Sequence, residues 1–217
     1  MTLTTIFKIL MSGMGVTVSI FLLTLLFSIP LGLPLTLLRM SKNKFLSLLA
    51  GAYISVMRGT PLMLQIIVIY FLPYYGFGLQ VTQEYRFVAV IIAFSLNYAA
   101  YFSEIYRSGI QSVPKGQYEA AQMLGYTRTQ TFVKIIMPQM FKRVLPAMTN
   151  EIITLVKDTS LSFAIATAEM FTMAKQIAAK EASLMPLMAA GVFYYIFNLL
   201  VAHVCKKVEK HYDYYRI

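Results

Sequence analysis

The feature that most constrains this chain is a succession of apolar stretches, each long enough to cross a lipid bilayer. A spanning helix needs about 20 mainly apolar residues. Five stretches meet this length, at residues 13–38, 45–72, 87–106, 144–166 and 184–205. Only 13% of the 217 residues are charged, which is about half of what a soluble domain carries. We therefore predict a single all-α membrane domain over residues 1–217, with about five transmembrane helices.

The first two stretches contain features that could interrupt a helix. Lys8 precedes the first stretch as in a signal peptide, but the apolar run is far longer than a signal h-region and no small-x-small cleavage pattern follows. We expect a retained helix whose inner end is bent by Pro30 and Pro34. The second stretch contains the polar break "RGTP" at residues 58–61, which can kink its helix.

The distribution of Lys and Arg predicts the orientation in the membrane, because short cytoplasmic loops are enriched in both. Thirteen of the nineteen lie after the first stretch, between the third and fourth stretches, or in the C-terminal tail. Four lie on the opposite side, at Lys8, Arg86, Lys175 and Lys180. We predict an N-terminus outside the cell and a cytoplasmic C-terminus. The net charge of +10 then reflects topology and indicates no nucleic-acid partner.

The polar segment at residues 112–139 is therefore expected in the cytoplasm. Pro114 is a helix-start signal, and a short helix is expected over residues 118–124. Gly125 should end it, because glycine accepts the left-handed cap conformation. A second helix is expected over residues 127–137, ending near Pro138. A short helix with a smooth, small-residue surface suits docking into a groove of another protein.

The spacing of this segment matches the EAA signature of bacterial ABC-importer permeases. The matching residues are Glu119, Ala120, Ala121, Gly125, Ile135 and Pro138. Met137 departs from the signature, which usually has Leu at that position. Three further stretches, "MRGTPLMLQ", "AAYFSEIYRSGI" and "LVKDTSL", resemble the polar-amino-acid subfamily. Over nearly its whole length the chain resembles a permease subunit of the histidine, glutamine or arginine type.

This resemblance implies a type I ABC importer permease fold in a bacterial cell membrane. It also implies cytoplasmic ATP-binding subunits, a second permease subunit that is identical or different, and an extracellular substrate-binding protein. The EAA segment would be the coupling helix, which fits a cleft in the ATPase through Glu119, Ala120, Ala121 and Gly125. No Walker sequence occurs in the chain. ATP and Mg would thus be held by the partner, and this subunit would be no enzyme and would need no cofactor.

Ionisable residues inside a membrane span are costly and are usually functional or paired. At a rise of 1.5 Å per residue, Glu151 and Asp158 lie about 10 Å and about 21 Å along the fourth stretch, on either side of the midplane. Their separation is close to two helical turns, so they share one face with Thr154 and Ser162. Asn97 in the third stretch, and Arg58 and Gln65 in the second, complete a polar cluster from three helices.

Two interpretations of this cluster are open. It could bind a zwitterionic amino acid, with the carboxylates toward the α-amino group or a cationic side chain. The candidate substrate-binding residues are Glu151, Asp158, Asn97 and Arg58. Alternatively, Arg58 and Lys157 could simply neutralise the two carboxylates. Glu104 and Arg107, three residues apart, are expected to form a separate local pair.

We predict a permease subunit that moves a polar amino acid into the cell, driven by a partner ATPase. The midplane charges alone would also permit an ion-coupled secondary transporter or a channel that needs no ATPase. A membrane enzyme is disfavoured, because neither a Ser–His–Asp arrangement nor an HExxH motif is present. The single Cys205 excludes an internal disulfide and a cysteine-based metal cluster.

Overall fold

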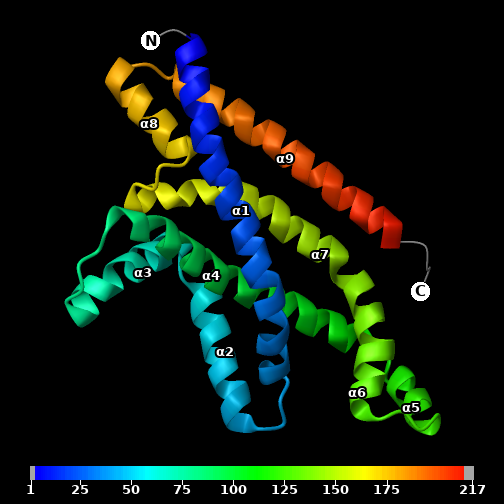
Figure 1. The fold of residues 1–217 in the computed structure, drawn as a ribbon. Coiled ribbons are helices and arrows are strands. Elements are labelled where there is room, and N and C mark those ends of the chain that lie inside the picture. The colour runs from blue at the N-terminus through cyan, green and yellow to red at the C-terminus, as the bar shows by residue number, and fades with distance from the viewer. Residues whose placement is uncertain (1–2, 213–217) are drawn as a thin grey trace.

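The computed structural model describes residues 3–212, and all regular elements in that range are helical (Figure 1). In chain order they are α1 (Leu3–Arg39), α2 (Lys44–Gly59), α3 (Leu62–Phe77), α4 (Gln83–Ser112), α5 (Lys115–Met123), α6 (Arg128–Thr131), the π turn η1 (Phe132–Ile136), α7 (Met137–Asp158), the 3₁₀ turn η2 (Thr159–Ile165), α8 (Met170–Glu181) and α9 (Met185–Tyr212). The all-α prediction is confirmed.

Three helices of the described range are long and apolar enough to cross a membrane, namely α1, α4 and α9. The α2–α3 pair adds a fourth candidate if it is taken as one broken span. Helix α7, where we predicted the fourth span, is not among them. It carries five charged side chains, at Lys142, Arg143, Glu151, Lys157 and Asp158. The described range thus holds three or four candidate spans, and the count of five stays a prediction.

The main core is built where α1 crosses α4. A Cβ added at Gly32 of α1 would lie 2.9 Å from the Cβ of Phe102 in α4, so glycine is needed for this close approach. One turn later, the Thr36 hydroxyl donates to the Ser103 carbonyl at 2.8 Å. The α1 helix continues through both of its internal prolines to Arg39. Burial of large side chains such as Phe94 holds α4 at the centre of the fold.

A second, smaller core joins the first half of α1 to α8 and α9. Leu10, Met170 and Ala190 are buried in it, one from each of the three helices. A Cβ added at Gly13 would lie 2.8 Å from the Cα of Met170, so α1 passes against the start of α8. Sequence analysis placed no helix between the fourth and fifth stretches, and α8 fills that interval.

The second stretch, residues 45–72, does not form one continuous helix, and its two helices are a candidate for one broken span. The chain forms two helices there, α2 and α3, bent by 110°. Pro61 has no N–H to continue the ladder, and the residue before a proline is driven out of the helical conformation. The Met57 carbonyl at the end of α2 accepts side-chain N–H groups from Gln65 and Asn97, both at 2.9 Å. These amides satisfy the helix end inside the fold and make the bend stable.

The predicted end of the second cytoplasmic helix near Pro138 is also wrong. Thr127 and Gln130 form a capping box that starts α6, as the expected helix start requires. The helix then widens into η1, where the N–H of Met137 donates to the Phe132 carbonyl. This wider turn accommodates Pro138 at the start of α7, and the helix continues to Asp158. The second cytoplasmic helix, expected over residues 127–137, is therefore α6 and η1, and these continue directly into α7.

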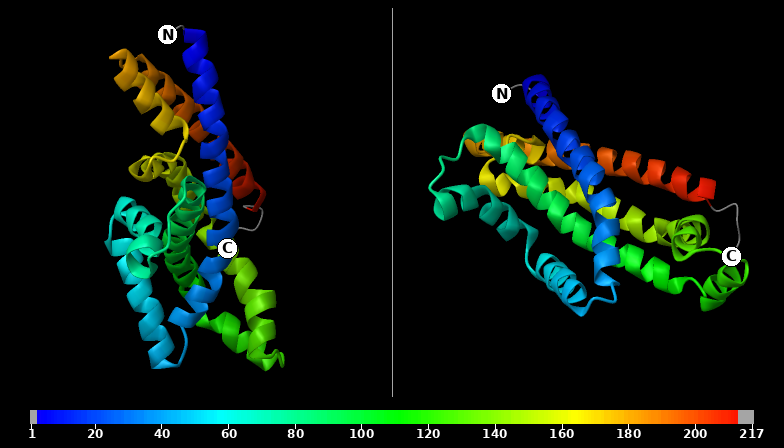
Figure 2. Two further views of the ribbon diagram at one scale, coloured as in Figure 1. Left: turned by 60° about the vertical axis from the view of Figure 1, so that its left-hand side comes forward. Right: turned by 60° about the horizontal axis from the view of Figure 1, so that its bottom comes forward.

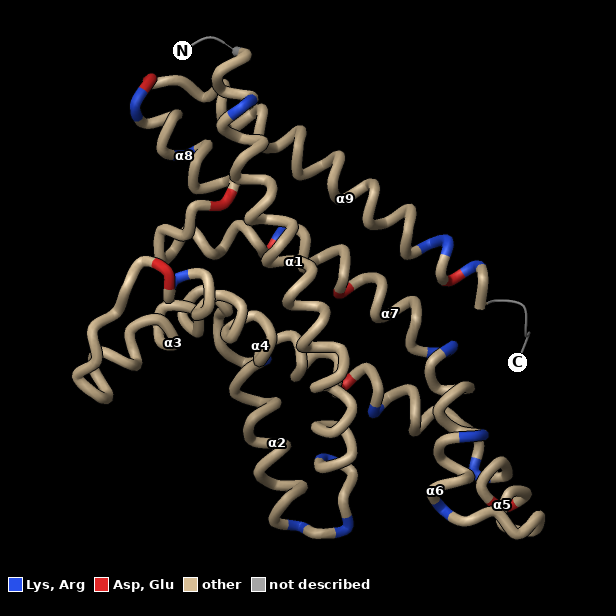
Figure 3. The backbone as a smooth tube through the Cα atoms, viewed as in Figure 1, with Lys and Arg blue, Asp and Glu red and all other residues tan. Residues whose placement is uncertain are grey.

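The elements divide the molecule into two ends. The N-terminus and α8 lie toward one end, while the α1–α2 connection and α5 lie toward the other (Figures 1 and 2). Helix α5 is at the tip of a protrusion formed with α6 and the start of α7. Lys and Arg gather at the α1–α2 connection, around α5 and α6, and at the C-terminal end of α9 (Figure 3).

Candidate functional site

A polar cavity of about 260 Å³ lies in the middle of the fold, where α4 faces α7 and the α2–α3 bend. We call it the central cavity. Its lining residues are Thr60, Leu62, Asn97, Tyr98, Tyr101, Glu151, Thr154 and Asp158. Three of the four predicted substrate-binding residues therefore meet in one place. They come from elements far apart in the chain, as the depth argument predicted.

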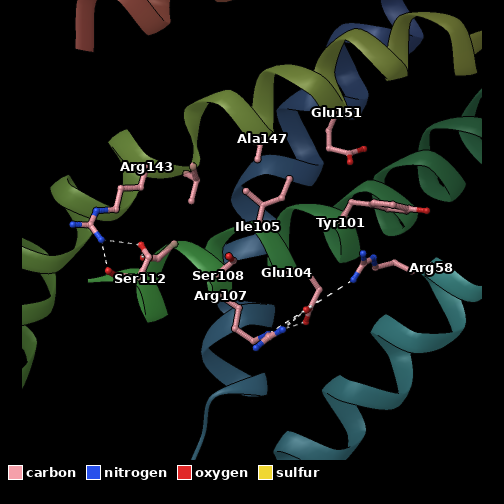
Figure 4. Close-up of a pocket in the computed structure, with 12 residues that line it drawn as sticks. Arg58, Tyr101, Glu104, Ile105, Arg107, Ser108, Ser112, Arg143, Ala147 and Glu151 are labelled. Atoms are coloured by element: carbon pink, nitrogen blue, oxygen red, sulfur yellow. Dashed lines mark hydrogen bonds and ion pairs between the residues drawn. The ribbon is translucent and has the colours of Figure 1, made fainter. Parts of the chain in front are cut away.

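A second cavity, of about 490 Å³, adjoins the first on the side of α5 and is shown in Figure 4. We call it the inner cavity. It includes Arg58, Glu104, Arg107 and Arg143. Tyr101 and Glu151 line both cavities, so the two spaces are neighbours along α4 and α7. Small-molecule sites usually occupy about 300–1,000 Å³, and the two cavities together are of that size.

The two carboxylates of the central cavity are held differently. Asp158 accepts a hydrogen bond of 2.7 Å from the hydroxyl of Tyr98, a residue that is itself buried against Phe94 and Phe102. Glu151 is half-buried and makes no hydrogen bond to another described residue. Its side chain points from α7 toward Tyr101 and Arg58 (Figure 4). A hydrogen bond thus holds Asp158 in position, whereas none holds Glu151.

The internal salt-bridge alternative is not formed. Within residues 3–212, no Lys or Arg nitrogen lies within 4.0 Å of Glu151 or Asp158. Arg58 pairs instead with Glu104 at 3.9 Å, and its guanidinium lies 5.2 Å from the centre of the Tyr101 ring. Lys157 is exposed. The predicted local pair is confirmed, because Arg107 donates to Glu104 at 2.6 Å.

Two predicted members of the polar cluster serve the fold. The Asn97 amide donates to Met57 and to the Gln65 oxygen, at 2.9 Å and 3.0 Å. Both of its N–H groups are therefore used at the α2–α3 bend, although Asn97 also lines the central cavity. Ser162 is outside that cavity and donates to the Thr159 carbonyl at 2.8 Å. The α-helix changes to a 3₁₀ turn after Asp158, so the expected continuation of one face fails.

Sequence analysis missed a buried carboxylate at Glu169. This residue is fully buried and caps α8, accepting the N–H groups of Phe171 and Thr172 at 2.7 Å and 2.6 Å. It also accepts the Tyr194 hydroxyl of α9 at 2.9 Å. An acidic residue just before a helix-like segment is an N-cap signal. Reading that signal would have predicted both the cap and α8.

The protruding helix α5 has the geometry expected for a docking element. Gly125 has φ of +77°, which confirms the left-handed cap. Its N–H donates to Gln122 and the next N–H, from Tyr126, donates to Ala121, the two bonds of a Schellman motif. Ala121 faces inward and is buried, while Glu119 and Ala120 are exposed.

The end of α5 also presents apolar side chains that sequence analysis did not single out. Met123 is 89% exposed and Leu124 is 75% exposed. A groove beside them is lined by residues of α5, α6 and the turn between these helices, including Gln122, Tyr126 and Arg128. Neighbouring exposed apolar side chains at the tip of a protrusion indicate a surface that another protein covers.

Comparison with known proteins gives consistent matches over nearly the full chain. The model of the family described as "Binding-protein-dependent transport system inner membrane component" matches residues 28–212. The L-cystine transport system permease protein TcyB of Bacillus subtilis (strain 168) is 38% identical over 210 residues, which is 95% of this chain and 88% of TcyB. The arginine transport system permease protein ArtQ of the same strain is 37% identical over 202 residues, covering 93% of this chain and 91% of ArtQ.

The solved structures give the same result for the fold. A crystal structure of an amino acid ABC transporter with histidines superposes with a TM-score of 0.86 and 31% identity. The match covers 97% of this chain and 100% of the other. The type I importer architecture expected from the EAA spacing is therefore confirmed at the level of the whole fold.

Proposed function

This chain belongs to the binding-protein-dependent transport system inner membrane components and is a permease subunit of an amino-acid ABC importer, and from that premise we propose how it holds its substrate and receives energy. The substrate is a polar amino acid that occupies the central cavity on its way into the cell. The observation that carries this proposal is that two carboxylates, Glu151 and Asp158, line the central cavity and form no ion pair with a described residue.

The charges of the central cavity favour a cationic group on the substrate. Two partly buried carboxylates that form no ion pair with a described residue are costly, and an α-ammonium or a cationic side chain would relieve this cost. Glu151, which has no hydrogen bond of its own, is the main partner for that group. Tyr98 holds Asp158 in place for a second contact. The hydroxyl of Thr154 offers a further polar group.

The inner cavity would serve as the route toward the cytoplasm. Three arginines and two glutamates line it, and Arg58 of α2 and Arg107 of α4 both pair with Glu104 of α4 (Figure 4). A substrate carboxylate leaving the central cavity would find these guanidinium groups next. The Arg58–Glu104 ion pair must change when α2 moves relative to α4. It is therefore a candidate contact of the inner gate.

Energy would enter through α5, which we assign as the coupling helix. Glu119, Ala120, Ala121 and Gly125 would form the part of the surface that fits a cytoplasmic ATP-binding subunit, with Met123 and Leu124 as apolar contacts. ATP and Mg would be bound by that partner, so the subunit itself would catalyse no reaction. Closure of the ATPase pair would move α5, and the firmly linked start of α7 would transmit the motion to Glu151.

The complete importer would contain two permease subunits, two ATP-binding subunits and an extracellular substrate-binding protein in a bacterial cell membrane. The gathering of Lys and Arg around α5 and at the end of α9 (Figure 3) favours a cytoplasmic position for that end. The N-terminus and α8 would then face the outside and the substrate-binding protein.

Replacement of Glu151 by Gln tests the substrate site. Charge-assisted hydrogen bonds contribute about 1.5–3 kcal/mol, so the apparent affinity in uptake should fall about 10–100-fold. Uptake by the reconstituted importer is measured with labelled arginine, histidine, glutamine and cystine. The matched control is Glu84→Gln, because Glu84 is exposed at the start of α4 and lines neither cavity. Full uptake by Glu151→Gln at low substrate concentration would remove Glu151 from the site.

A secondary transporter or channel remains the competing function, and the same preparation distinguishes it. Liposomes that contain the permease without ATP-binding subunits should take up no labelled amino acid, with or without an ion gradient. Uptake that is equal in the presence and absence of the ATPase would overturn the importer mechanism.

A further inference from the structure

A pocket of about 380 Å³ lies between α7 and the C-terminal end of α9, and it shares no residue with the central or inner cavity. We call it the α7–α9 pocket. Its lining residues are Lys142, Leu145, Pro146, Lys206, Glu209, Lys210 and Tyr212. Three lysines and one glutamate leave it with a net positive charge. Neither the transport route nor the coupling helix uses it.

Lys142 is the unusual member of this pocket. Its ammonium nitrogen is buried and has no hydrogen-bond partner among the described residues. Lysine normally buries its aliphatic chain and keeps its charged end in water, and a buried charge without a partner is costly. Glu209 lines the same pocket but does not come within ion-pair distance of it. Lys142 therefore carries a buried ammonium group that no side chain of the described residues neutralises.

The surroundings indicate the kind of anion. Leu145 and Pro146 supply apolar walls, and Leu199 on α9, which is 50% exposed, lies about two helical turns before Lys206 and therefore on the same face. Tyr212 closes one side and makes an edge-to-face contact with Phe141, at 5.7 Å between ring centres. Tyrosine is enriched where a spanning helix leaves the membrane. The pocket is thus basic on one side and apolar on the other, at the end of a candidate span.

We propose that the α7–α9 pocket binds the headgroup of an anionic phospholipid. The phosphate would lie among the ammonium groups of Lys142, Lys206 and Lys210, and the acyl chains would run along the exposed apolar face of α9. Basic pockets between transmembrane helices at the cytoplasmic side accept such headgroups. Glu209 offers an acceptor to a headgroup hydroxyl, so phosphatidylglycerol is the probe of choice. A soluble phosphate would leave the apolar face uncovered.

The site would fix α9 to α7, the helix that carries both carboxylates of the central cavity. Anionic lipid would therefore stabilise the importer without touching the substrate. This consequence is independent of which amino acid is carried. The α7–α9 pocket differs from the other basic surface at this end of the protein. Solvated surface lysines have no buried ammonium group that needs an anionic partner, whereas Lys142 does.

The test measures lipid retention by the purified importer complex. The complex is incubated in detergent with phosphatidylglycerol or with phosphatidylcholine of the same acyl chains, and bound lipid is counted by native mass spectrometry. The wild-type complex should retain phosphatidylglycerol preferentially. A lysine near anionic lipid changes binding by about fivefold, so Lys142→Gln should lower retention by about that factor. Lys207→Gln is the matched control, because Lys207 is exposed on α9 and does not line the pocket.

Two results would overturn the proposal. One is equal retention of phosphatidylglycerol by wild type, Lys142→Gln and Lys207→Gln. The other is displacement of the lipid by millimolar inorganic phosphate, which would mean an adventitious ion only. If Lys142→Gln fails to assemble, Lys210→Gln tests the same pocket, since Lys210 lines it but is exposed and its loss leaves no gap in the core. Loss of lipid with unchanged uptake affinity would support the lipid site even where the substrate proposal fails.

Discussion

Substitution of Gly125 by Val should uncouple ATP hydrolysis from transport while leaving the membrane part of the subunit intact. Gly125 adopts φ of +77° at the end of α5, a conformation that β-branched residues rarely take. A Cβ added there would meet no atom within 4 Å. The cost of the substitution is therefore a backbone cost and involves no steric clash with the rest of the protein.

The magnitude follows from two contributions. A non-glycine residue in the left-handed conformation costs about 1–2 kcal/mol. If the backbone escapes that strain, the two Schellman hydrogen bonds at Gln122 and Ala121 are lost, at about 0.5–1.5 kcal/mol each. In either case the capped conformation of α5 is destabilised by about 1–3 kcal/mol. At about 2 kcal/mol the docked conformation becomes roughly 30-fold less populated. The loss is local, because α5 is mostly exposed and protrudes from the fold.

The assay compares uptake per ATP hydrolysed in proteoliposomes, together with limited proteolysis around α5. Gly125→Val should hydrolyse ATP with little uptake and should be cleaved faster at α5. Gly125→Asn should keep most of the coupling, because Asn tolerates the left-handed conformation. Gly116→Val is the control for bulk on the same helix, since Gly116 also has open space around it and no positive φ. Normal coupling by Gly125→Val would refute the assigned role of this hinge.

Three further predictions concern topology and stability. In a Cys205→Ser background, a cysteine at Lys180 should react with an impermeant reagent in intact cells and a cysteine at Lys134 should not; external labelling at Lys134 would reverse the orientation. Asn97→Leu should lower the free energy of unfolding by about 1–3 kcal/mol, since it leaves the buried Gln65 oxygen without its donor. The folded fraction should keep its substrate affinity, and a selective loss of affinity would mean that Asn97 contacts the substrate. Glu169→Ala should lower the melting temperature by several degrees, because it removes the cap of α8 and its link to α9; an unchanged melting temperature would mean that this carboxylate is not needed for stability.

Local properties of the chain were readable from the sequence. The apolar stretches at 13–38, 87–106 and 184–205 lie within α1, α4 and α9 to within one residue, because hydropathy over about 20 residues decides whether a helix can span. The left-handed conformation of Gly125 was predicted correctly, because the missing Cβ of glycine is what permits a positive φ. Glu104 and Arg107 were predicted as a pair because helical spacing alone brings them together.

Contacts between distant residues were decided only by the tertiary structure. The sequence left open whether Arg58 neutralises a carboxylate of α7, and packing of α2 against α4 pairs Arg58 with Glu104 instead, so that Glu151 has no ion pair with a described residue. The α2–α3 bend depends on Asn97, a residue of α4 that no local pattern connects to Met57. The buried ammonium of Lys142 likewise results from α9 packing on α7. Hydropathy and spacing fix which residues share a depth and a helix face, whereas the rotation of each helix against its neighbours determines which of those residues meet.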